Sequence, residues 1–133
     1  MIDIENIVFA NIANELREQF NPIFIYGEYV KAPADFPAVC IEEKSNADYY
    51  RTQDSNSENH ASLMYEVNVY SNKQVGKKAQ CKEIFKVIDE QFKEMGFTRI
   101  LKEPVPNLQN ATIYRMIGRY TAVSSADGKI FRR

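Results

Sequence analysis

The sequence predicts an α+β fold in which one mixed or antiparallel β-sheet carries two main helices on a single face. Two segments repeat apolar residues every three or four positions, as helices do, whereas several shorter runs alternate or are rich in β-branched and aromatic residues, as strands are. These segments follow one another as helix, two strands, loop, strand, helix and strands. At 133 residues the chain suits one compact domain, so we expect residues 1–133 to share one core.

The first expected helix spans residues 4–20, where apolar residues at spacings of three and four share one face. Asp3 can cap its start, and Pro22 can end it. Residues 23–26 and 38–41 are short β-rich runs separated by a polar stretch that contains proline. These two runs predict two strands joined by a loop.

Residues 44–60 show no sustained period of either kind and are rich in Ser, Asn and Asp, so a long polar loop is expected there. Compact domains seldom keep such a long irregular segment without a use for it, which favours a binding or assembly role over simple tolerance. The candidate interface residues in this segment are charged or tyrosine: Asp48, Tyr49, Tyr50, Arg51 and Asp54.

The second half of the chain carries the clearest patterns. Residues 63–70 alternate between two faces, which predicts a strand. An apolar stripe then runs to about Met95 and predicts the second helix. Ser71 and Asn72 are candidate caps for its start, and Gly96 stands where a left-handed residue would end it.

The remaining segments predict further strands. One is expected at residues 97–101. Residues 104–107, Pro-Val-Pro-Asn, predict a connector, because proline lacks the amide donor that a central strand needs. The last long strand is expected at residues 111–123, and residues 129–131 would pair with it as a hairpin.

Catalytic and metal-binding patterns are missing from the sequence. The five glycines are too dispersed to form a phosphate-binding loop. The single histidine, His60, and the two cysteines, Cys40 and Cys81, lack the close spacing of a zinc site, and both cysteines fall in segments expected to be buried. We therefore expect no enzyme activity, no cofactor and no metal.

Signals for export or membrane insertion are also missing. No apolar run is long enough to cross a membrane, and residues 1–20 mix acids into the apolar pattern, unlike a secretory signal. Two cysteines cannot form the disulfide network of a small secreted domain. An intracellular, reducing origin without membrane contact is therefore expected.

The net charge of −1 hides a strong asymmetry along the chain. Residues 1–66 hold 12 acidic and 4 basic side chains, whereas residues 67–133 hold 6 and 13. Such a split either gives opposite faces that attract neighbouring copies head to tail, or is cancelled locally when folding interleaves the two halves. The sequence leaves both alternatives open.

Basic residues complete the candidate interface. Lys77, Lys78 and Lys82 lie on the second expected helix, where an ordinary charged helix face and a phosphate-binding stripe are the alternatives. Arg115 and Arg119 share one face of the last long strand. Two arginines there need acidic partners, either within the sheet of the same chain or across a subunit boundary.

Four short motifs within residues 63–132 carry a family resemblance. They are Val69-Tyr70-Ser71 at a strand end, Gly76-Lys77-Lys78-Ala79 at a helix start, the Met95-Gly96-Phe97 break and Tyr114-Arg115 on a strand. Together they resemble the tail terminator or tail-completion proteins of long-tailed bacteriophages and prophages of Gram-positive bacteria. Proteins of this family are also called head-to-tail joining proteins.

The resemblance implies an α+β subunit of the virion tail that forms a ring, usually a hexamer. Such a ring caps the growing tail tube, halts its polymerisation and offers a docking surface to the head-completion or connector protein. Assembly would take place in the cytoplasm of the host bacterium, and DNA would pass only as cargo. A related head-completion or tail-tube component is the close alternative, and a small enzyme or nucleic-acid-binding module is the distant one.

Overall fold

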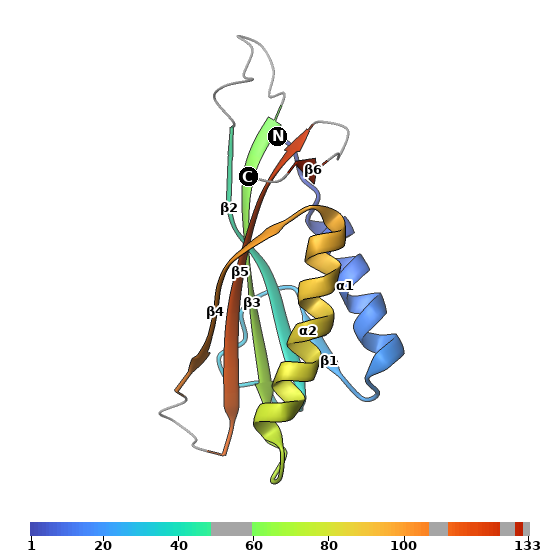
Figure 1. Cartoon of the computed structure of the whole chain (residues 1–133), viewed down its shortest axis with the longest axis vertical. Coiled ribbons are helices and arrows are strands. Elements are labelled where there is room, and N and C mark those ends of the chain that lie inside the picture. Colours follow the sequence, from blue (N-terminus) through green and yellow to red (C-terminus); the bar gives the residue numbers. More distant parts are fainter. Residues whose placement is uncertain (49–59, 107–111, 126–129, 132–133) are drawn as a thin grey trace.

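A computed structural model describes residues 1–48, 60–106, 112–125 and 130–131 of the chain. The elements in this part are α1 (Glu5–Gln19), β1 (Phe24–Tyr26), β2 (Ala38–Asp48), β3 (His60–Ser71), α2 (Lys77–Met95), β4 (Thr98–Val105), β5 (Tyr114–Ser125) and β6 (Ile130–Phe131). Both helices lie on the same side of the sheet (Figure 1).

The strands form a mixed sheet in the order β1-β2-β3-β5-β4, and β6 pairs with the end of β5. β1 runs parallel to β2, whereas the other described pairs are antiparallel. β3 lies at the centre and pairs with β5 along its whole length, from His60 opposite Ser125 to Ser71 opposite Tyr114. The expected α+β fold with two helices on one face is therefore confirmed.

The core lies between this sheet and the helices. Tyr65, Val67 and Val69 alternate along β3 and are fully buried against the helical layer. The helices contribute residues three and four positions apart: Val8, Ile12 and Leu16 from α1, and Cys81, Ile84, Phe85, Ile88 and Phe92 from α2. The apolar periodicity of the sequence thus marks the buried face of each helix.

Aromatic rings fill the part of the core near the end of α2. The Phe92 ring stacks on Tyr120 at a centroid distance of 4.1 Å and meets Phe97 edge to face at 5.1 Å. Tyr65 meets Phe97 at 5.5 Å in a perpendicular arrangement. These rings join α2 to β3 and β5, so the orientation of α2 on the sheet is fixed by aromatic packing.

The ends of the helices agree only in part with the sequence. Gly96 is left-handed, with φ of 99°, and ends α2 as expected. Ser71 and Asn72 do not cap α2, because pairing with β5 holds Ser71 in β3 and the helix begins only after Gly76. The Ser71 hydroxyl instead contacts the Gln80 side chain and accepts a hydrogen bond from the backbone amide of Lys73. Asp3 does accept an amide at the start of α1, from Glu5 at 3.1 Å.

The expected loop at residues 44–60 is wrong at both ends. β2 continues to Asp48 and β3 already begins at His60, so only residues 49–59 lie outside the described strands. A β-bulge between Glu43 and Ser45 shifts the register, after which pairing with β3 resumes. The side chain of Asn46 donates to the Ile2 carbonyl at 2.7 Å, which ties this polar part of β2 to the N-terminal segment.

The expected connector at residues 104–107 is also wrong, because β4 continues through Pro104 and Val105. These residues pair with Met116 and Arg115 of β5. β4 is an edge strand, where proline is tolerated because its missing donor faces away from the sheet. β5 begins at Tyr114, and β6 pairs with it as predicted.

Candidate interaction surfaces

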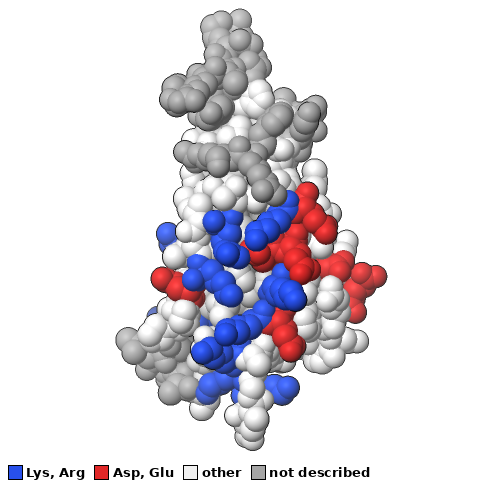
Figure 2. Space-filling view, in the orientation of Figure 1, with Lys and Arg blue, Asp and Glu red and all other residues white. Residues whose placement is uncertain are grey.

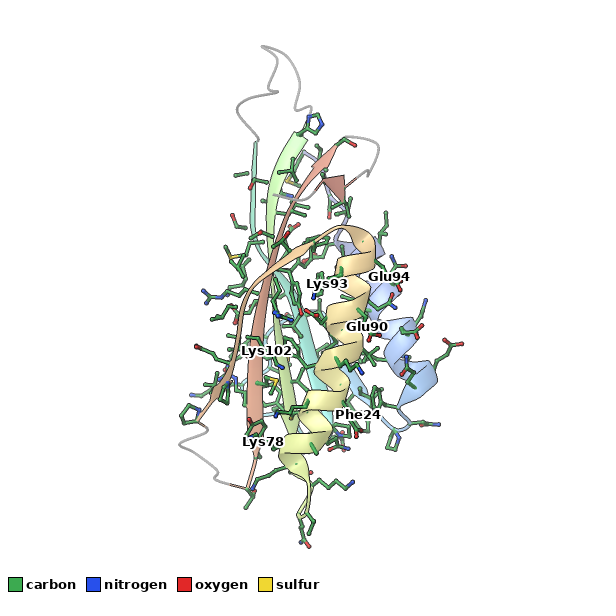
Figure 3. All side chains as sticks on the ribbon, in the orientation of Figure 1. Phe24, Lys78, Glu90, Lys93, Glu94 and Lys102 are labelled. Atoms are coloured by element: carbon green, nitrogen blue, oxygen red, sulfur yellow. The ribbon has the colours of Figure 1, made fainter. Side chains whose placement is uncertain are left out.

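A row of lysines runs along the flank of α2 that faces β4. Lys78, Lys82 and Lys86 are exposed at intervals of four residues, and Lys102 of β4 lies beside them with its ammonium 5.4 Å from the Phe85 ring. No carboxylate of the described residues lies within ion-pair distance of these four lysines, which we call the basic flank. Figure 2 shows blue side chains gathered over α2 and its β4 side, and Figure 3 places Lys78 and Lys102 there.

An aspartate fixes α2 beside β4 and thereby builds the basic flank. Asp89 of α2 accepts a hydrogen bond from the Tyr120 hydroxyl at 2.8 Å and forms ion pairs with Lys93 and Arg99, each at 3.0 Å. Burial alone would raise the pKa of Asp89, but the hydrogen bonds from Tyr120 and Lys93 and the charge of Arg99 outweigh it and lower that pKa. The charge of Asp89 is therefore balanced by Lys93 and Arg99, and Asp89 forms no ion pair with the four lysines of the basic flank.

Replacing Asp89 with asparagine is expected to destabilise the protein at neutral pH by about 1 kcal/mol, because charge-assisted hydrogen bonds are lost while the amide oxygen still accepts from Tyr120. A carboxylate whose pKa is lowered in the folded state stabilises it above the unfolded pKa, and this stabilisation is lost as pH falls through the folded pKa. The difference between the wild type and Asp89→Asn in urea unfolding should therefore shrink progressively as pH falls from about 5 through the folded pKa of Asp89. A constant difference over that range would contradict the assignment.

An acidic surface lies next to the basic flank, on the α1 side of α2. Glu90 and Glu94 are exposed on α2, and Figure 3 places both on the side that faces α1. The two helices are in contact there, since the side-chain amide of Asn11 donates a hydrogen bond to the Met95 sulfur at 3.4 Å. Glu15 and Glu18 follow Asn11 by four and seven positions and so share its face of α1. Glu15, Glu18, Glu90 and Glu94 form what we call the acidic flank.

The sheet face away from the helices holds a polar ladder across β3 and β5. Arg119 forms an ion pair with Glu66 at 3.3 Å. Nε and Nη2 of Arg115 donate to the side-chain oxygen Oδ1 of Asn68 at 3.0 and 2.7 Å. The side-chain amide nitrogen of Asn68 in turn donates to the Glu66 carboxylate at 3.4 Å. Of the two alternatives for these arginines, Arg119 thus takes its acidic partner within the sheet.

Arg115 differs from Arg119 because its hydrogen-bond partner is a neutral amide. Its guanidinium also lies 5.5 Å from the Tyr29 ring and 5.6 Å from the Tyr70 ring, as in cation–π contacts. Tyr29 belongs to the segment between β1 and β2, and Val30 and Phe36 of the same segment pack against the cluster of Ala38, Cys40 and Tyr70. Arg115 therefore helps to hold this segment against the sheet.

The other expected interface residues are only partly placed. Asp48 ends β2, opposite Ala61 of β3. Tyr49, Tyr50, Arg51 and Asp54 lie outside the described residues. Lys77 is half-buried one turn before Cys81, on the core side of α2, whereas Lys78 and Lys82 are exposed. Together with Lys86 and Lys102, Lys78 and Lys82 form the basic flank. The four-residue spacing in the sequence indicates Lys86, but nothing local indicates that a β4 side chain would lie beside α2.

Buried thiols and a small hollow are the other candidate sites. Cys40 and Cys81 are both free and buried, and burial raises the pKa of the Cys81 thiol to about 12. A hollow of about 170 Å³ between α1 and the sheet is lined by Glu5, Asn6, Phe9, Gly27, Ile41 and Tyr65. Ligand pockets usually measure about 300–1,000 Å³, so this hollow is too small for a typical organic ligand. Among the described residues no group of three or more His, Cys, Asp or Glu side chains is arranged to hold a metal ion.

Comparison with known proteins adds no assignment: no family model matches the sequence, and no curated protein matches it. None of the helices in the described part of the chain combines the length and the apolar character that a membrane span requires.

Proposed function

We propose that this chain is a tail terminator of a long-tailed bacteriophage or prophage. Copies of it would form a ring, with six subunits as the expected number, on the last ring of the tail tube. The ring stops further addition of tube protein and presents its other side to the head-completion or connector protein. Assembly takes place in the bacterial cytoplasm, the product belongs to the virion tail, and no chemical reaction is involved.

The observation that carries this proposal is the elongated strand pair β2–β3, supported by the motif resemblance. Asp48 pairs with Ala61, so both ends of segment 49–59 are held on adjacent strands at one end of the molecule. Figure 1 shows that this end lies beyond the helices. A ring of such subunits would place six copies of this end of the β2–β3 strand pair on one side of the ring. Contact with another ring of a tail requires such a directional surface.

Tube polymerisation provides a direct test. Purified protein is added to the tail-tube protein of the same phage during its assembly, and tube lengths and tube ends are recorded by electron microscopy. Tubes should become shorter as the ratio of this chain to tube protein increases, and extra density should cap one end. Unchanged tube lengths together with bare tube ends would exclude the tail terminator function.

A variant in segment 49–59 tests whether that segment makes the contact. Arg51→Ala together with Asp54→Ala changes two charged residues of the segment, both of which lie outside the described part of the chain. This variant should fold and self-associate as the wild type does, yet cap tubes poorly. Lys31→Ala is the matched control, because Lys31 is an exposed residue between β1 and β2.

A further inference from the structure

We infer that the basic flank of one subunit binds the acidic flank of a second copy of this chain. This inference rests on the ring assembly proposed above and names the two surfaces that would form its contact. The basic flank is Lys78, Lys82, Lys86 and Lys102, and the acidic flank is Glu15, Glu18, Glu90 and Glu94.

Charge complementarity identifies the occupant. The four lysines have no acidic partner within the described part of the chain, although Lys93 and Arg99 close by are both paired with Asp89. On the opposite flank, Glu18, Glu90 and Glu94 form none of the ion pairs found among the described residues. Each flank therefore has the chemistry that the other one lacks.

The two flanks lie side by side on the outer face of the helical layer. The lysines lie toward β4 and the glutamates toward α1 (Figures 2 and 3). A contact that joins the basic flank of one subunit to the acidic flank of the next uses two different surfaces and is therefore heterologous, and it repeats around a ring when the rotation closes. The residues of both flanks that belong to α2 are held in place on the sheet, because the Asp89–Tyr120 hydrogen bond and the stacking of Phe92 on Tyr120 join α2 to β5.

The sheet edges are less suited to join subunits. Beyond its short pairing with β1, the outer edge of β2 is interrupted by the bulge at Glu43 and Ser45, and the Glu43 amide already donates to Glu5 at 3.4 Å. On the other edge, Pro104 of β4 has no amide to donate. Both features discourage the addition of a further strand. Contacts between the charged flanks are made by side chains and therefore need no free backbone groups at a sheet edge.

A charge-swap experiment tests the contact. The variant Lys82→Glu/Lys86→Glu makes both flanks acidic, and the variant Glu90→Lys/Glu94→Lys makes both basic. Each variant alone should self-associate at least about tenfold more weakly than the wild type by sedimentation velocity, whereas an equimolar mixture should assemble again. Raising the salt concentration should weaken the wild-type assembly, because exposed charges are screened. Lys31→Glu and Glu28→Lys, placed between β1 and β2, are the matched controls and should assemble as the wild type does.

Four results would overturn the inference. They are self-association that survives both double reversals, failure of the mixed variants to assemble, a closed two-fold dimer in place of a larger ring, and a wild type that stays monomeric at every concentration and salt. In the last case, salt-dependent binding of duplex DNA that is lost in Lys82→Glu/Lys86→Glu would assign the basic flank to nucleic acid instead.

The outcome separates this contact from the proposed function. Wild-type rings that survive both reversals but still cap tail tubes would refute the contact and leave the tail terminator proposal intact. Rings that depend on both flanks but do not change tube length would support the contact and refute the tail terminator proposal.

Discussion

Replacing Phe92 with alanine is expected to lower the free energy of unfolding by about 3–5 kcal/mol. Phe92 is fully buried, stacks on Tyr120 at 4.1 Å and meets Phe97 at 5.1 Å. Its removal leaves a cavity at the junction of α2, β3 and β5 and also removes ring contacts worth about 0.5–1.5 kcal/mol each. Urea unfolding followed by circular dichroism, at one fixed protein concentration, measures the loss.

Phe92→Leu provides the comparison for this variant, because it keeps most of the apolar volume and loses the ring contacts. It should destabilise the protein clearly less than Phe92→Ala, and it remains measurable if the alanine variant does not fold. A loss below about 1 kcal/mol for Phe92→Ala would mean that the core at this position collapses around the deletion, contrary to the packing described.

The second large effect is expected at Gly118 of β5. A Cβ atom at this position would lie 2.6 Å from Cε2 of Phe85 and still closer to Cζ. Phe85 is itself fully buried, so its ring cannot move away without disturbing its neighbours. Gly118→Ala should therefore cost about 1–3 kcal/mol through overpacking, although alanine is otherwise the better strand residue.

A double-mutant cycle separates this steric conflict from a general effect of the backbone. Phe85→Leu removes ring atoms that meet the new methyl group, so the pair Gly118→Ala/Phe85→Leu should be less destabilised than the sum of the two single variants. Gly27→Ala is the control, since its Cβ would lie 3.7 Å from Phe9, an ordinary contact. Additive effects in the cycle would show that the Phe85 ring is not the obstacle.

Local pattern was sufficient to predict the elements with a clean period. The buried stripe of α2, its left-handed end at Gly96 and the alternation of β3 all follow from spacing, because each residue in them meets the core or solvent directly. The pairing of Arg119 with Glu66 was one of two alternatives, and it is decided by register: the two residues lie directly opposite each other on β3 and β5.

Tertiary contacts determine what the sequence could not reveal. Residues 44–48 carry no strand pattern, yet they pair with β3, and Asn46 is held by the Ile2 carbonyl. Pro104 lies in a strand because β4 is an edge, which its local sequence does not indicate. The acidic flank combines residues from both halves of the chain, so the charge split along the sequence describes this surface only in part.

The antiparallel pairing at the end of β2 and β3 also bears on how such a chain can evolve. Because Asp48 and Ala61 are paired, the two ends of the intervening segment are fixed close together by the sheet itself. In proteins generally, the entropy cost of closing a loop between fixed ends rises by only about 0.6 kcal/mol for each doubling of the loop length. Under the function proposed above, insertions and deletions between these strands are therefore expected to change partner choice while the core and the helical layer keep their sequence, so that related chains would diverge in partner choice faster than in fold.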